Sequence, residues 1–157
     1  VDLPLQCFDL WHDRAVMHFL TNIKDRQAHR SKVLASLKPG GFIAILAFAE
    51  DGPDSCSGLP VQRFSIDALK DEFGKNFCLV AGEKHSHFTP NGMEQRFVSC
   101  LFQLTDAHES TVRNTKEKEN DYKGKTGIIM EVLIAACNSS KSVSIFRKTS
   151  FYKDGKT

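Results

Sequence analysis

Two apolar segments flank an amphipathic one in the first third of the chain, which predicts a strand–helix–strand unit. Cys7–Trp11 is a short apolar run that only Asp9 interrupts, as expected of a central strand. Asp25–Leu37 places apolar residues on one side and basic residues on the other, which predicts a helix. Phe42–Phe48 is apolar at every position, as in a parallel strand covered by helices on both faces. Such crossovers join parallel strands, and open α/β sheets bind ligands at the carboxyl ends of those strands.

Two short segments complete this unit. Ala15–Leu20 is apolar apart from His18 and predicts one or two buried helical turns, with His18 packed in the interior. Lys38–Gly41 reads Lys-Pro-Gly-Gly and predicts a turn that ends the helix, because proline cannot continue it and glycine accepts a left-handed backbone.

The pattern after residue 48 predicts one more helix and two more strands. Ser65–Phe73 has the features of a capped helix, with Ser65 at the N-cap and Gly74 just after the end. Ala49–Pro60 is predicted as a loop and Phe77–Gly82 as a strand. His85–Met93 is predicted as a polar loop with a strong turn signal, and Arg96–Thr105 as a strand.

The composition changes near Thr105, where we place a domain boundary. Residues 1–105 carry 11 basic and 12 acidic side chains, whereas residues 106–157 carry 10 and 7. Almost nothing is apolar in residues 106–125, and the run Lys116–Asp121 is expected to stay solvated. Gly127–Ala136 predicts a short helix or strand, and Ser142–Phe146 a short strand. The extension 106–157 is therefore expected to be charged and flexible, with no assigned role.

The length and composition of the chain are those of one globular domain, with 41% hydrophobic and 25% charged residues. The formal charge of +2 gives no global field that would indicate a nucleic acid. The five cysteines are an odd number without a Cys-x-x-Cys pair, which favours free thiols and a cytoplasmic location. No signal peptide is visible, and the longest apolar run, Gly127–Cys137, is shorter than the roughly 18–20 residues of a membrane span. Because the chain begins with Val1, we expect a processed product or the back part of a longer chain.

Several motifs in residues 8–105 occur together in one known family. Asp9–Leu20 reads Asp-Leu-Trp-His-Asp-Arg-Ala-Val-x-His-Phe-Leu, and Leu37–Gly41 precedes a buried strand. With these two, the chain resembles the C-terminal half of class I S-adenosylmethionine-dependent methyltransferases, more narrowly small stand-alone members of bacterial type. The further matching motifs are Gly52-Pro53, Cys56–Pro60, Thr89-Pro90 and Gln95–Phe97.

The resemblance implies an α/β, Rossmann-like methyltransferase fold of which this chain holds only the fourth to seventh strands, followed by the polar C-terminal extension. The family sheet has seven strands with helices on both faces, and its last strand is antiparallel. Only seven residues precede Phe8, and no Gly-x-Gly-x-x-Gly occurs, so most of the cofactor site is expected to be missing. The fourth strand of the family, which is the first strand of this chain, should then expose an edge that invites pairing or aggregation.

The resemblance also implies a site at the end of this chain's first strand, which matches the fourth strand of the family. Trp11, His12 and Asp13 match the positions that face the methionine portion of S-adenosylmethionine. Asp13 or His12 would be the base or would position the nucleophile, and Arg14 would hold a carboxylate. The alternative is structural: Asp13 and Arg14 pair with each other, and His12 caps the following turn.

Two further groups are expected on loops that close over a substrate, Cys56-Ser57-Gly58 and His85-x-His87. No metal is predicted, because the two histidines lack a third ligand at suitable spacing.

The sequence thus predicts an enzyme that transfers a methyl group to an unidentified acceptor, as part of a longer chain. Small thiols, metalloid species, small carboxylates and protein side chains all remain open as acceptors, and neither nucleic acid nor membrane is indicated. The alternative is a non-catalytic remnant or interaction module that lacks the cofactor site.

Overall fold

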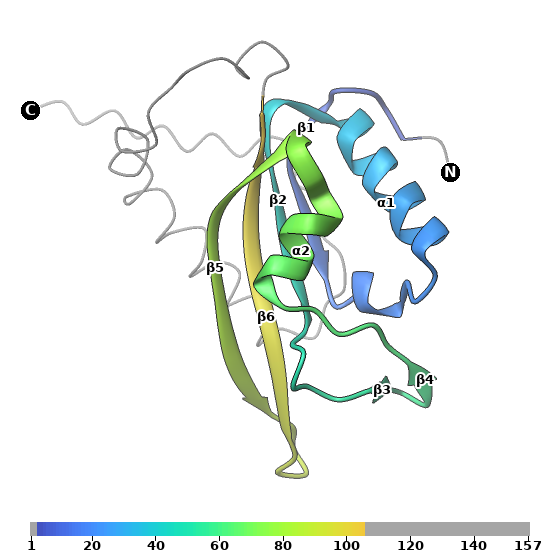
Figure 1. The fold of residues 1–157 in the computed structure, drawn as a ribbon, viewed down its shortest axis with the longest axis vertical. Coiled ribbons are helices and arrows are strands. Elements are labelled where there is room, and N and C mark those ends of the chain that lie inside the picture. Colours follow the sequence, from blue (N-terminus) through green and yellow to red (C-terminus); the bar gives the residue numbers. More distant parts are fainter. Residues whose placement is uncertain (1–2, 106–157) are drawn as a thin grey trace, which may run out of the picture.

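The computed structural model describes residues 3–105, and the predictions for residues 106–157 lie outside this part. Four long strands and two helices make up the described fold (Figure 1): β1 (Phe8–Arg14), α1 (Ile23–Ser36), β2 (Leu37–Phe48), α2 (Ile66–Phe73), β5 (Phe77–Phe88) and β6 (Glu94–Leu104). Shorter elements connect them: η1 (Met17–Phe19), β3 (Ser55–Cys56), β4 (Leu59–Pro60) and η2 (Gly74–Asn76).

The four long strands form one mixed sheet in the order β1-β2-β6-β5. β1 and β2 are parallel, with Trp11 opposite Ile43 and His12 opposite Ala44, which confirms the predicted strand–helix–strand unit. β6 runs antiparallel to both β2 and β5. Within residues 3–105, β1 is an edge strand whose one strand neighbour is β2.

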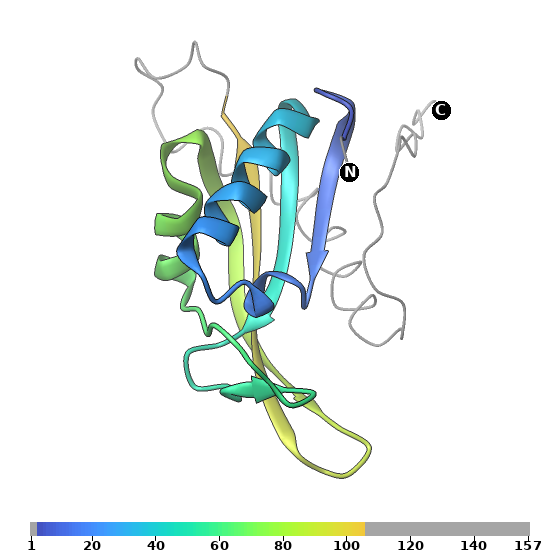
Figure 2. The ribbon, with the colours of Figure 1, turned by 90° about the vertical axis from the view of Figure 1, so that its right-hand side faces the viewer.

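Both helices lie on the same face of the sheet (Figure 2). They cover a core of alternate strand residues and inward helix residues, among them Ile45, Phe102, Val33, Leu69 and Phe73. A smaller cluster around Ala44 and Leu101 lies on the opposite face. β2 is therefore buried on both faces as predicted, but the part of the chain that the structure describes has helices on one face alone.

The predicted helix α2 is confirmed together with its caps. Ser65 Oγ accepts a hydrogen bond from the Ala68 amide at 3.0 Å, which satisfies one free N–H of the first turn. Leu69 and Phe73 are fully buried, and Gly74 has φ +62° at the C-cap.

The predicted Lys38–Gly41 turn between α1 and β2 is wrong. α1 ends at Ser36, and Leu37 is already extended, so residues 38–41 lie inside β2. They form an irregularity in the pairing, because Phe8 pairs with Leu37 whereas Leu10 pairs with Phe42. Gly40 takes φ +71° there, so the glycine serves a bulged strand rather than a helix end.

The predicted polar loop His85–Met93 is also largely wrong. β5 continues to Phe88, and only the turn after it leaves the strand, with the Gly92 amide donating to the Thr89 carbonyl at 2.8 Å. Polar residues extend the strand because each pairs with a residue of β6, for example His87 with Gln95. The predicted loop Ala49–Pro60 contains the β3–β4 hairpin, whose turn residues Ser57 and Gly58 both have positive φ.

Candidate functional site

Three connections meet at one end of the sheet. β1, β2 and β5 run in the same direction, so η1, the segment 49–65 and the turn between β5 and β6 all follow carboxyl ends of strands. Figure 1 shows this end at the bottom. Open α/β sheets bind ligands at such an end, and most of the residues singled out in the sequence lie there.

Asp13 shapes the turn that leaves β1. Its side chain is 2% exposed, and Oδ1 accepts hydrogen bonds from the amides of Val16 (3.3 Å) and Met17 (3.1 Å). Oδ2 lies 3.0 Å from Nε2 of His29 on α1. The interaction that caps the turn therefore comes from Asp13, and the alternative in which His12 caps it is wrong. The catalytic role of Asp13 stays a prediction.

Trp11 lies on the same side of β1 as Asp13. Its ring meets Phe8 edge-on at 6.4 Å and His29 edge-on at 5.9 Å between centroids. His29 was not singled out in the sequence, although it lies four residues before the buried Val33 and so on the same side of α1. Trp11, Asp13 and His29 form one cluster between β1 and α1.

His12 and Arg14 point to the opposite face, because side chains alternate along a strand. His12 is 8% exposed. Burial lowers its pKa, more than the Asp13 charge raises it, and Arg14 lowers it further. His12 is therefore neutral at pH 7 and able to accept a proton. The structure thus divides the predicted site residues between the two faces.

A row of stacked rings crosses this end of the sheet. His18 stacks on Phe48 (4.5 Å between centroids), Phe48 on Phe97 (4.7 Å) and Phe97 on His85 (6.0 Å). His18 is fully buried, as predicted, and burial lowers its pKa to about 4. His87 meets Phe97 edge-on at 6.5 Å. His85 and His87 therefore belong to a strand rather than to a loop, and a substrate role for His87 stays a prediction.

The remaining predicted residues lie on the β3–β4 hairpin. Cys56 is half-buried, and Ser57 and Gly58 are exposed at the turn. Cys56 Sγ lies 3.9 Å from Ser57 Oγ. Within residues 3–105 this contact pairs the thiol with a hydroxyl group rather than with a base, so the hairpin offers hydrogen-bonding groups more than a nucleophile.

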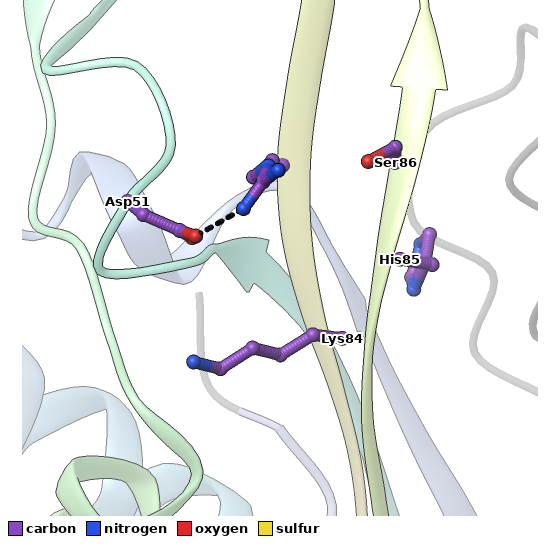
Figure 3. A pocket seen from close by; sticks show the side chains of 5 residues that line it. Asp51, Lys84, His85 and Ser86 are labelled. Atoms are coloured by element: carbon purple, nitrogen blue, oxygen red, sulfur yellow. Dashed lines mark hydrogen bonds and ion pairs between the residues drawn. The ribbon is translucent and has the colours of Figure 1, made fainter.

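A charged hollow of about 170 Å³ lies between the segment after β2 and the β5–β6 hairpin (Figure 3). Arg96 Nη1 contacts Asp51 Oδ2 at 2.6 Å, and this hydrogen bond holds the pKa of Asp51 below its usual value. Arg96 also lies 3.4 Å from Glu94, and Lys84 pairs with Glu50. The sequence did not predict this network, because its charged residues lie on segments that only the fold brings together. The alternating charges along those segments were the one signal of it.

No three His, Cys, Asp or Glu side chains gather as metal ligands within residues 3–105. No helix in that same range is long and apolar enough to cross a membrane. Within this range, Cys56, Cys78 and Cys100 are free thiols.

No protein-family model matches the chain, and no curated protein sequence matches it either. The solved structures with a similar fold include the following two. A SAM-dependent methyltransferase from Methanosarcina mazei superposes with a TM-score of 0.55 at 13% identity, over 67% of this chain and 63% of that one. The second is a protein from work on the conversion of a disulfide bond into a thioacetal group during echinomycin biosynthesis. It superposes with a TM-score of 0.51 at 13% identity, over 87% of this chain and 57% of that one. The chain thus spans about three fifths of each, and its mixed α/β sheet is similar to the methyltransferase fold.

Proposed function

We propose that the chain serves S-adenosylmethionine-dependent methyl transfer and that its four long strands correspond to the fourth to seventh of the methyltransferase sheet. One observation carries the proposal: the last strand, β6, is the one long strand of residues 3–105 that runs against the others, as the last strand of that fold does. The fold likeness supports the same assignment.

The described residues fit the cofactor in part. S-adenosylmethionine supplies an electrophilic methyl group on a sulfonium when it is bound. His12 and Asp13 lie near the carboxyl end of β1 and Trp11 at its middle, and these residues would meet the methionine portion from the two faces of the strand. Residues 3–105 contain no glycine-rich loop for the nucleoside half. That half of the site would come from polypeptide that pairs with the free edge of β1.

The chain's own residues then have separate roles. Asp13 and His29 hold the turn after β1 in place, so that the site is preorganised. His12, kept neutral by burial, accepts the proton of the acceptor, and Arg14 holds an anionic group. Cys56, Ser57, Gly58 and His87 would lie on the acceptor side.

The test is a calorimetric titration with S-adenosylhomocysteine of two proteins, the 157-residue chain and the same chain extended by its upstream coding sequence. We expect binding by the extended form and none by the chain alone. In the extended form, His12→Asn should lower kcat for methyl transfer while leaving S-adenosylhomocysteine binding intact. An extended form that fails to bind would overturn the proposal.

The open edge of β1 also favours a second candidate, a non-catalytic interaction module. The transcript discriminates between the two. A continuous upstream frame with a strand, a glycine-rich loop and an acidic strand end favours the enzyme. A start codon or a frame break just before Val1 favours the module.

A further inference from the structure

The face of the sheet opposite the two helices, called the second face, is buried at its centre. Ala44 of β2 and Leu101 of β6 are register partners on this face, and both are 0% exposed. The partly buried residues packed against this pair all belong to the strands themselves: Leu10, Phe42, Val80 and Ala81. Strand neighbours shield a side chain at its flanks, whereas cover from above needs a second layer. Within residues 3–105, however, both helices lie on the other face (Figure 2).

Polar groups of the second face are buried as well. His12 of β1 is the register partner of Ala44, and it is largely enclosed. Ser99, two residues before Leu101 on the same side of β6, is 2% exposed, and its Oγ lies 3.5 Å from Nδ1 of His85. The enclosed area therefore extends from β1 across β2 to β6, over three strands of the sheet.

The longest apolar run of the chain lies outside the described residues. It is Gly127–Cys137, in which nine of the eleven residues are apolar and Glu131 is the one charged residue. Exposed to water, such a run would form an apolar patch that favours aggregation. The second face and this run therefore each need an apolar partner.

The run is tethered close to the second face. Thr105 directly follows β6, and Leu101 lies four residues earlier, about 13 Å along the strand. The 21 residues 106–126 separate Thr105 from the run. A chain of that length without fixed structure has an end-to-end distance of about 25 Å, which is enough to reach the centre of the face. Tethering gives the run an effective concentration in the millimolar range, which favours it over a second copy of the chain.

We infer that residues 127–137 form the missing layer on the second face and pack their apolar side chains over Ala44 and Leu101. Part of the C-terminal extension then belongs to the domain and borders His12, the register partner of Ala44. The inference goes beyond the proposed function, which concerns the free edge of β1, and it holds whether or not the chain transfers methyl groups.

The test measures alkylation of a thiol on the second face, in the 157-residue chain that carries Ala44→Cys. Peptide mass spectrometry separates the sites, and the native Cys100, which faces the helices, reports loss of the whole fold. We expect slow alkylation at position 44, and a rate about tenfold higher or more when Leu133→Asp is added, with Cys100 unchanged. The matched control Phe146→Asp lies outside the run and should leave position 44 protected. Fast alkylation at position 44 without Leu133→Asp, or protection that persists with it, overturns the inference.

If position 44 and Cys100 become reactive together, Leu133→Asp has unfolded the protein, and crosslinking decides instead. A photo-crosslinking residue is placed at position 133, in an equal mixture of chains with and without heavy nitrogen. Adducts within one chain that map to Ala44 or Leu101 support the inference. Adducts that join heavy to light chains identify a second copy as the occupant and overturn it, as do adducts at other places or none at all.

Discussion

At the residue scale, Asp13 connects the end of β1 to α1. Its carboxylate accepts hydrogen bonds from two backbone amides and faces His29, sixteen residues away in sequence. One buried side chain therefore fixes the backbone of the turn that carries the candidate site. His12 and Arg14 are the neighbours of Asp13 in β1, and their side chains point to the other face of the strand.

Replacing Asp13 with alanine should destabilise the fold by about 3 kcal/mol, because the Val16 and Met17 amides lose their acceptor and Met17 is buried. Asp13→Asn keeps an oxygen at the same place and should cost clearly less. Urea unfolding of the three proteins measures both values. Equal losses for the two variants would mean that the charge facing His29, rather than the two hydrogen bonds, supports the turn.

His18 makes the stability depend on pH in the acid range. Burial lowers its pKa from 6.5 to about 4 in the fold, although the Asp13 charge partly opposes this, so the unfolded chain binds the proton more readily. Stability should therefore fall as the pH drops from 6.5 towards 4, by up to about 3 kcal/mol from this residue. His18→Phe preserves the stacking on Phe48 and should remove this part of the slope.

The measurement is urea unfolding of the wild type and of His18→Phe at pH 7 and at pH 4.5. Contributions of the other histidines are common to both proteins and cancel in the difference. Parallel pH profiles for the two would show that His18 is not held neutral in the fold.

At the scale of elements, the segment after β2 is tied closely to β6. The Ala49 amide donates to the Arg96 carbonyl at 3.0 Å, and Asp51 pairs with the Arg96 side chain. Gly52 lies so close that an added Cβ would stand 2.5 Å from the same Arg96 carbonyl oxygen. This contact fixes where the β3–β4 hairpin begins.

Gly52→Ala should therefore cost about 2–3 kcal/mol, because backbone atoms rather than a flexible side chain must move. Gly58→Ala is the matched control. Its Cβ would meet nothing within 4 Å, and its φ of +78° should cost only about 1 kcal/mol. Thermal unfolding of both variants gives the comparison. A Gly52→Ala protein as stable as Gly58→Ala would mean that the segment shifts freely away from β6.

At the scale of the whole molecule, the strands of the sheet differ in how well their backbone amides are protected from exchange with solvent. β2 and β6 are hydrogen-bonded to strands on both sides, whereas β1 and β5 each have one strand neighbour within residues 3–105. Amide hydrogen exchange should therefore be slowest in β2 and β6 and faster in β1. If the extended form pairs with the free edge of β1, exchange in β1 should slow to that of β2. Unchanged exchange in β1 between the two forms would contradict the proposed completion of the sheet.

The sequence alone determined the elements whose signals are local. The apolar run of β2, the capped helix α2 and the parallel crossover through α1 depend on periodicity, capping and turn chemistry within a few residues, and the structure confirms all three. The position of His18 in the interior followed in the same way from its apolar neighbours.

Only the tertiary structure decided what depends on pairing between distant segments. Residues 38–41 became part of a strand because β1 lies beside them, and the polar residues 83–87 remained extended because β6 pairs with each of them. The contact between Asp13 and His29 likewise arises from parts of the chain far apart in sequence. The physical reason is that hydrogen bonding between strands and burial against a neighbouring element outweigh local secondary-structure propensity. A single sequence shows the propensity of each segment but not which segments lie beside it in space.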